Sequence, residues 1–204
     1  MKDYIVIDGV TYDLVKRVGE TETVPGTGLI AGPKLADFTA GDTVKIGSHE
    51  MIVLEHLGAA TLLLRKESLG EMAFGENNNY DGSNVDEICN EFAEEIAGIV
   101  GEDNILPHEV DLTSDDGLKD YGKLQRKASL LTADRYREYV AILDKHKINA
   151  WWWLATALST PTHGIEYAVK CVSPSGYFNN NNYLYYDDAV RPFCILRSSI
   201  FVSD

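Results

Sequence analysis

The chain has 204 residues, of which 45% are hydrophobic and 25% are charged, and its formal net charge is −14. These values are typical of a soluble globular protein with one substantial core. The negative charge argues against nonspecific nucleic-acid binding, because phosphate groups would repel the chain. No apolar run approaches the roughly 20 residues needed to span a bilayer, so membrane insertion is not expected.

Residues 1–40 read as a short N-terminal extension. The first residues, MKDYIVIDGVTYDL, lack a long apolar stretch and include Asp3 and Asp8, which argues against a cleaved secretion signal. We therefore expect synthesis in the cytoplasm. The protein could still leave the cell as part of a larger particle such as a virion. A strand-like YIVI precedes ETETVPGTGLIAGP, which has no hydrophobic period. This extension either packs on the domain or mediates assembly into a homo-oligomer.

Residues 41–67 contain three β-rich runs, separated by Gly47-Ser48 and Gly58-Ala59. Val44 and Ile46 share one face of a strand, as do Ile52 and Leu54, so the segment predicts a meander with one buried side. The polar stretch FGENNNYDGSN that follows predicts a loop.

Two amphipathic helices are predicted in the middle of the chain. The first begins at a capping box formed by Asn84 and Glu87, and the second follows Thr132. Between them, HEVDLTSDDGLKDYG predicts a loop and SLLT a short buried strand. The residues expected to face the core are Val85, Ile88, Phe92, Ile96 and Ile99 in the first helix, and Tyr136, Tyr139, Val140 and Leu143 in the second.

The last quarter of the chain differs in composition from the rest. Residues 151–204 hold 11 of the 20 aromatic residues and carry a net charge of −1, whereas residues 76–120 carry −13. The strand-like segments EYAVKCV and VRPFCIL flank a turn at residues 173–176 and the polar tract FNNNNYLYYDD. We expect the run Trp151–Trp153 to anchor the core rather than to form a sugar-stacking platform. Arg191 is expected to make a structural ion pair or a backbone contact.

The order of several segments resembles a family of C-type-lectin-fold domains from gut bacteria and their phages. The segments are GDTVKIGSHEMIVLE, SLLTADRYREY, WWWLATA, CVSPSG and AVRPFCIL, and the resemblance runs over about residues 41–202. The resemblance implies an α+β domain over residues 41–204, in which a short mixed or antiparallel sheet packs with two helices. In such a fold we expect residues 151–153 and 190–196 to share one sheet.

The same C-terminal signature is similar to that of the variable target proteins of diversity-generating retroelements. In that class, a reverse transcriptase copies a template with errors at adenines, and the varied residues lie on an exposed face. The resemblance implies a receptor-recognition protein that binds a cell-surface protein or glycan through a region at about residues 155–190. Asn and Tyr codons contain adenine, and this region is rich in both residues.

The tract from Tyr177 to Tyr186 is polar, aromatic and uncharged. Tyr supplies rigid contact area and Asn supplies adaptable hydrogen bonds, as in antibody loops, although a solvated loop packed on its tyrosines would look the same. The candidate ligand-binding residues are Thr160, Thr162, His163, Tyr167, Lys170, Tyr177, Asn179, Asn180, Asn181, Asn182, Tyr183, Tyr185 and Tyr186.

Enzymatic and metal sites receive little support from the sequence. The five histidines are far apart, Asp115-Asp116 and Asp187-Asp188 are ordinary in so acidic a chain, and calcium-binding lectin motifs are missing. Cys89, Cys171 and Cys194 are expected to be reduced core residues, with a Cys171–Cys194 bridge left open. We therefore expect no catalysis, metal or cofactor. The alternatives are an enzyme of the formylglycine-generating type, which has a similar fold, and an assembly subunit of a phage particle.

Overall fold

A computed structural model describes residues 4–7, 10–13 and 32–203. The chain divides into two compact units, Met1–Gly32 and Pro33–Asp204. In the first unit, β1 (Tyr4–Ile7) and β2 (Val10–Asp13) pair as an antiparallel hairpin, so the predicted strand YIVI is confirmed. Most of the segment that was predicted to pack or to assemble lies outside the described residues.

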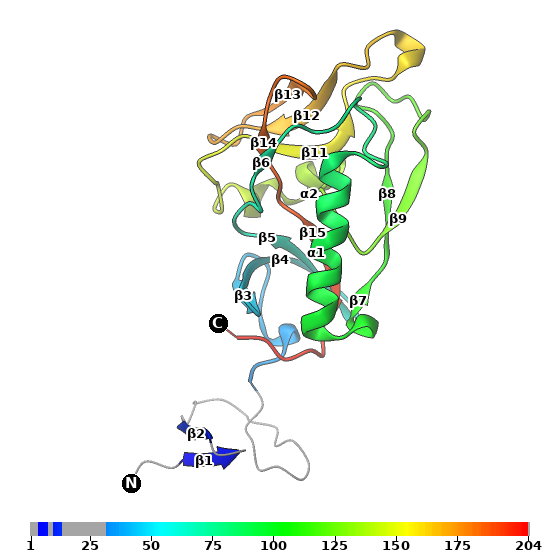
Figure 1. The fold of residues 1–204 in the computed structure, drawn as a ribbon. Helices are drawn as coiled ribbons and strands as arrows, with labels where there is room; N and C mark the ends of the chain where they lie inside the picture. Colours follow the sequence, from blue (N-terminus) through cyan, green and yellow to red (C-terminus); the bar gives the residue numbers. More distant parts are fainter. Residues whose placement is uncertain (1–3, 8–9, 14–31, 204) are drawn as a thin grey trace. The chain divides into compact units, whose positions relative to one another are not determined.

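A six-stranded antiparallel sheet forms one half of the second unit (Figure 1). The three runs predicted in residues 41–67 are its strands, and the closing strand of the chain pairs beside them. Pairing follows the order β10-β15-β5-β4-β3, with β7 also on β15. The strands are β3 (Thr43–Ile46), β4 (His49–Leu57), β5 (Ala60–Arg65), β7 (Ile105–Leu106), β10 (Ala128–Ser129) and β15 (Phe193–Arg197).

Both faces of this sheet are buried, so the prediction of one buried side was wrong. Alternate residues of one strand belong to different hydrophobic clusters: Val53 packs with Phe92 of the first helix, whereas Ile52 packs with Leu143 of the second. Two covered faces explain why β4 and β5 read MIVL and TLLL, continuous apolar runs rather than alternating ones.

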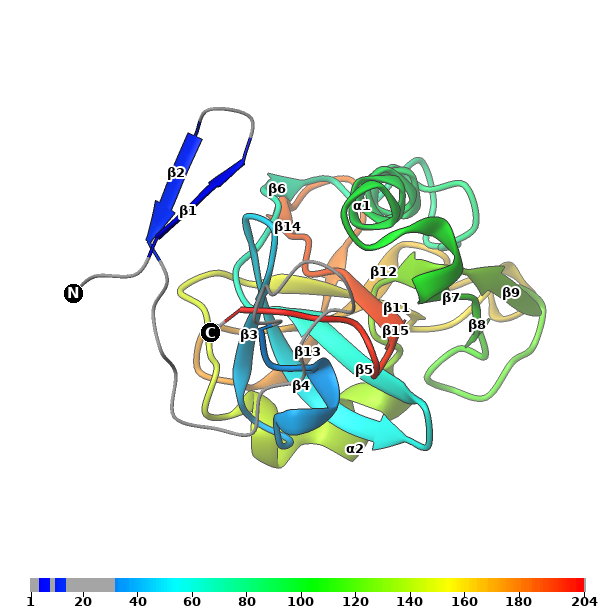
Figure 2. The ribbon, with the colours of Figure 1, turned by 90° about the horizontal axis from the view of Figure 1, so that it is seen from below.

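The two helices, α1 (Asn84–Val100) and α2 (Ala133–Leu143), lie on opposite sides of the sheets (Figure 2). Thr132 caps α2 as predicted, but α1 is capped by Ser83, whose Oγ accepts from the Asp86 amide. Two residues predicted to face the core do not, because Ile99 is 45% exposed and Val140 is 38% exposed. The other predicted core positions on the helices are buried, apart from the half-buried Ile88.

A second, five-stranded sheet forms the other half of the unit, in the order β13-β12-β11-β14-β6. Its strands are antiparallel except for the pair β11–β14. The polar tract FNNNN, predicted within a loop region, is one of them. The strands are β6 (Glu71–Met72), β11 (Trp152–Ala157), β12 (Ala168–Val172), β13 (Phe178–Asn182) and β14 (Asp188–Ala189).

Residues 151–153 and 190–196 therefore do not share one sheet, contrary to the prediction. The chain crosses between the sheets just before β15. The amide of Val190 donates to the Gly70 carbonyl at 2.9 Å, and the Pro192 carbonyl accepts from Arg65 at 2.8 Å. Since Pro192 has no amide hydrogen, it cannot donate a backbone hydrogen bond to a neighbouring strand at this crossing.

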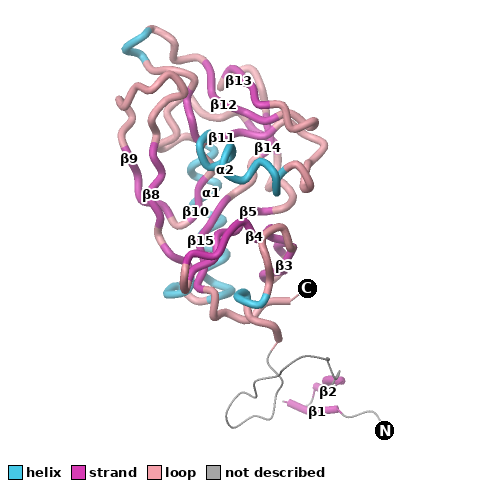
Figure 3. Tube along the Cα trace, turned by 180° about the vertical axis from the view of Figure 1, so that it is seen from behind, coloured by secondary structure: helices cyan, strands magenta, loops and turns pink. Residues whose placement is uncertain are grey.

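The segment predicted as a long loop includes one strand of a hairpin, β8 (His108–Asp111) with β9 (Lys123–Arg126), visible along one side in Figure 3. Arg126 fastens this hairpin to α1, because its guanidinium donates to the buried Asp86 carboxylate at 2.8 and 2.9 Å. Short 3-10 turns complete the described elements: Leu35–Asp37, Glu102–Asn104 and Pro161–His163.

The aromatic and cationic residues of the last quarter serve the core. Trp152 packs towards α2 and Trp153 into the cluster under α1, both nearly fully buried. The buried Arg191 lies with its guanidinium 4.9 Å from the Trp152 ring centroid and donates to the Arg65 carbonyl, so the predicted backbone contact is confirmed. The three cysteines are free and buried, with no Cys171–Cys194 bridge. The α+β class with two helices is thus confirmed.

Candidate functional site

Most of the predicted recognition residues lie on or beside β12 and β13, at the end of the unit away from β3 (Figure 1). The antiparallel register runs from Ala168 opposite Asn182 to Val172 opposite Phe178, which holds the Asn tract in extended backbone. Asn179–Asn182 and Tyr183 are half-buried, and Thr162 and His163 are exposed in the preceding 3-10 turn.

Tyrosine side chains project from both ends of this strand pair. Tyr167 is 53% exposed, Tyr177 65%, Tyr185 78% and Tyr186 53%. They include every exposed tyrosine of the described part of the chain, and Leu184 is exposed among them. Tyr177 precedes β13, whereas Tyr185 and Tyr186 follow it, so the aromatic groups flank the Asn tract. We call this region, residues 162–167 and 177–186, the Tyr/Asn surface.

Two predicted ligand-binding residues are buried, and their assignment to the surface was wrong. Thr160 is fully buried, and its hydroxyl donates to Asp120 at 2.6 Å. Lys170 is 6% exposed, ion-pairs with Asp115 at 3.2 Å and lies 4.3 Å from the Phe178 ring centroid. Thr160 is tied to Asp120 ahead of the 3-10 turn, and Lys170 lies on β12, which is buried along its length, so neither side chain is available to a ligand.

The four asparagines of β13 have different environments. Asn181 donates through Nδ2 to the buried carboxylate of Asp188 at 2.8 Å, and Asn182 accepts from the Leu184 amide at 3.0 Å. Burial raises the pKa of Asp188 to about 6, and the hydrogen bond from Asn181 opposes this rise. Asn181 is therefore part of the scaffold, whereas Asn179 and Asn180 are the better candidates for contact with a ligand.

Two carboxylates, Asp116 and Asp120, organise the loops beside the Tyr/Asn surface. Asp116 accepts from the hydroxyls of Ser114 and Ser159 at 2.5 Å each and contacts His163 Nδ1 at 2.9 Å. These hydrogen bonds hold the pKa of Asp116 well below its ordinary value. Asp120 accepts from the hydroxyl of Thr162, so residues 114–120 hold the turn at one end of the Tyr/Asn surface. The dense acidic segment SDDGLKD was the only sequence signal for this role.

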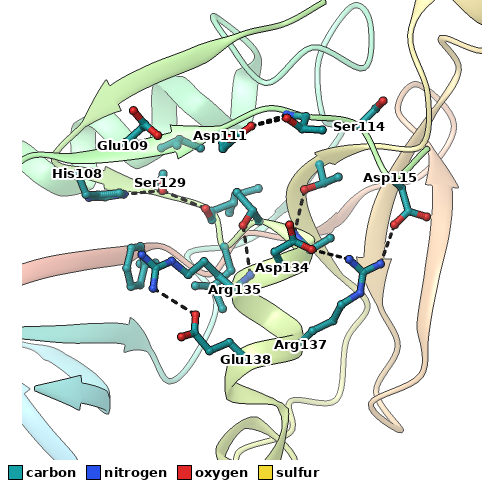
Figure 4. A pocket seen from close by; sticks show the side chains of 18 of the residues that line it. His108, Glu109, Asp111, Ser114, Asp115, Ser129, Asp134, Arg135, Arg137 and Glu138 are labelled. Atoms are coloured by element: carbon teal, nitrogen blue, oxygen red, sulfur yellow. Dashed lines mark hydrogen bonds and ion pairs between the residues drawn. The ribbon is translucent and has the colours of Figure 1, made fainter. Parts of the chain in front are cut away.

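A cavity of about 650 Å³ lies beside this loop, between the β8–β9 hairpin and the first turns of α2 (Figure 4). Its walls carry five carboxylates and three cationic side chains, so it offers no net attraction to an anion. Arg137 ion-pairs with Asp115 and Asp134 at 2.7 Å, and Arg135 ion-pairs with Glu138 at 3.2 Å. Because both arginines are already paired with carboxylates, the cavity suits uncharged polar groups better than anions.

One pair of residues in this cavity resembles a nucleophile and its base, but its geometry argues against that role. His108 Nε2 lies 2.9 Å from Ser129 Oγ, and the Ser129 hydroxyl donates to the Leu130 carbonyl at 3.0 Å. With its proton given to that carbonyl, Ser129 accepts from the imidazole instead of donating to it. Ser129 is 1% exposed, and His108 Nδ1 has no partner that would orient the ring.

The described residues offer few other reactive groups. Burial raises the pKa of Cys89, Cys171 and Cys194 to about 12, so each thiol stays protonated. The described part of the chain contains no group of three His, Cys, Asp or Glu side chains placed to hold a metal ion. Among the described helices, none is long and apolar enough to cross a membrane.

Comparison with known proteins gives one match. Residues 105–198, somewhat less than half of the chain, are similar to a domain of unknown function (DUF6273). The matched segment begins at β7, ends just after β15 and includes the polar cavity and the Tyr/Asn surface. No curated protein and no solved structure matches the chain.

Proposed function

We propose that this protein is a non-catalytic recognition module that binds a macromolecular target, a cell-surface protein or glycan, through the Tyr/Asn surface. The observation that carries this proposal is the gathering of the exposed tyrosines around one uncharged strand. Tyr combines large contact area with few rotatable bonds, so a tyrosine-rich surface binds at a low cost in side-chain entropy. Single exposed apolar residues are ordinary, but a local group of them is typical of an interaction site.

The scaffold beneath the surface supports this role. The backbone of β13 is paired along its length with β12, and Asp116, Asp120 and Asp188 fix the adjoining side chains. A surface held in place before binding loses little conformational entropy when its target arrives. The same arrangement would tolerate exchange of exposed side chains, since substitutions at exposed positions usually change stability by under about 0.5 kcal/mol.

Together with the sequence resemblance, this tolerance leads us to propose a variable protein of a diversity-generating retroelement on a lectin-like scaffold. An enzyme of the formylglycine-generating type, on a similar fold, is the alternative, but the protonated, buried cysteines disfavour it. A separate test is genetic. The proposal predicts a reverse-transcriptase gene and a near-copy of the 3′ end of this gene in the adjoining DNA, and the lack of both would contradict it.

Binding itself is tested with the purified full chain carrying a fluorescent label. The labelled protein is applied to an array of bacterial and mammalian glycans and to a panel of intact gut-bacterial cells, some treated with protease. We expect saturable binding to a restricted set, with protease sensitivity separating protein targets from glycan targets. Uniformly weak binding to all surfaces would contradict selective recognition.

A further inference from the structure

The edge of the second sheet formed by β13 has free hydrogen-bonding groups. β13 is the terminal strand of its sheet and pairs with β12 alone among the described strands. On β13's paired side, Ser173 donates to the Tyr177 carbonyl at 2.9 Å and Tyr183 donates to the Tyr167 carbonyl at 3.3 Å.

These two bonds fix which backbone groups point outward. Bonding alternates along an antiparallel ladder, so Asn179 and Asn181, in step with Tyr177 and Tyr183, point their amides and carbonyls at β12. Phe178, Asn180 and Asn182 therefore point theirs at the free edge. No backbone hydrogen bond joins these outward groups to another described segment.

This edge lacks the features that usually prevent strand pairing. Edge strands are commonly protected by lysine, proline, a bulge or a covering segment. The stretch from Tyr177 to Tyr186 contains no charged residue and no proline, in a chain with a net charge of −14. Two copies of an acidic chain can therefore approach along this stretch with little charge repulsion.

We propose that β13 pairs with β13 of a second copy of this chain, antiparallel and about a two-fold axis at Asn180. The outward groups of Phe178, Asn180 and Asn182 then meet Asn182, Asn180 and Phe178 of the second copy, forming about six hydrogen bonds. The pairing joins the two five-stranded sheets into one and presents two Tyr/Asn surfaces in a single particle.

The distribution of charge favours this antiparallel arrangement. At the end of β13 near Phe178, Arg137 and Lys170 share the carboxylates of Asp115 and Asp134. Lys147 there pairs with Asp144, so this end is close to neutral. At the other end, Glu166 and Asp187 are exposed and have no ion pair within the described residues. Antiparallel pairing sets the acidic end of each copy against the neutral end of the other.

Cysteine cross-linking tests the register. Residue 180 meets itself across the axis, about 5.5 Å apart between Cα atoms, within disulfide range. Residue 182 lies about 13 Å from its copy, which is too far. The native cysteines are buried, so mild oxidation of the full chain should cross-link N180C at least tenfold more than N182C. Equal cross-linking of the two variants, or none at position 180, would overturn the proposal.

Sedimentation equilibrium of the full chain without any target gives a second readout, independent of the proposed function. We expect a concentration-dependent monomer–dimer equilibrium that N180P abolishes at an unchanged melting temperature, because that amide points away from β12. N179K is the matched control. In the proposed register, residue 179 lies opposite Asn181 of the second copy, so the two introduced lysines do not face each other and the dimer should persist. A chain that stays monomeric at every concentration would overturn the proposal.

Discussion

Asn181, on the half-exposed strand β13, donates its side-chain amide to the carboxylate of Asp188, which is 4% exposed on β14. β13 and β14 are not neighbours in the sheet, since β12 and β11 lie between them. The hydrogen bond therefore connects β13 to the interior across the sheet. It makes Asn181 a structural residue, whereas Asn179 and Asn180 have no such bond to the interior.

Replacing Asn181 with Ala should lower the free energy of unfolding by about 1–3 kcal/mol, because a buried carboxylate loses its hydrogen-bond donor. Asn180→Ala is the control and should cost under about 0.5 kcal/mol, since its side chain has no such partner. Urea unfolding followed by tryptophan fluorescence measures both. Equal effects of the two substitutions would show that the Asn181–Asp188 bond is energetically unimportant.

Asp188 should also give the protein a pH-dependent stability. Its folded-state pKa of about 6 lies above the ordinary value of 3.8 because of burial, so the folded protein favours the protonated acid. This contribution is fully present below about pH 3.8 and is lost as pH rises through 6, amounting to about 2–3 kcal/mol. Asp188→Asn should remove it, which thermal unfolding of both proteins between pH 4 and 7.5 would measure. Parallel stability curves for the two proteins would contradict the assignment.

His108 should change the pH dependence of stability in the direction opposite to Asp188. Burial, and then the charge of Arg135, lowers its pKa to about 4, so the folded protein disfavours the imidazolium ion. Stability should therefore fall as pH drops from about 6.5 to 4, by about 3 kcal/mol. Gln at this position can replace the Nε2–H donor without titrating. His108→Gln should consequently flatten this part of the stability curve, and an unchanged slope would rule the imidazole out as its source.

The bond between the β8–β9 hairpin and α1 should be among the more costly to break. Arg126 is 20% exposed at its side chain and Asp86 is 2% exposed, so Arg126→Met leaves a buried carboxylate unpaired. We expect a loss of about 3 kcal/mol in the free energy of unfolding. Lys123→Met, which breaks exposed pairs with Glu109 and Asp111 on the same hairpin, should cost under about 1 kcal/mol. Similar losses for both variants would contradict this account.

The sequence predicted those features that depend on local pattern. The meander, both helices and the Thr132 cap follow from hydrophobic spacing and capping chemistry over a few residues. The partition into two sheets could not be predicted in this way, because it depends on the crossing at Val190–Pro192 and its partners Gly70 and Arg65, far away in sequence.

The candidate site was predictable in part for the same reason. Its composition identified the Tyr/Asn tract, but a run of asparagines has low strand propensity, and only pairing with β12 makes it a strand. Burial of Thr160 and Lys170 depends on Asp120 and Asp115, which lie about 40 and 55 residues earlier in the chain. No local pattern records such distant partners.

The central claim is that the exposed tyrosines bind the target, and a matched pair of variants tests it most directly. Tyr185→Ser with Tyr186→Ser removes two exposed aromatics from the Tyr/Asn surface, whereas Leu57→Ser with Val140→Ser removes two exposed apolar residues elsewhere. Binding of each labelled protein is measured on the glycan array and cell panel that retain the parent. We expect the tyrosine variant to lose at least about tenfold in affinity, as hot-spot tyrosines do, and the control to bind like the parent. Equal binding by all three proteins, at equal melting temperatures, would contradict the claim.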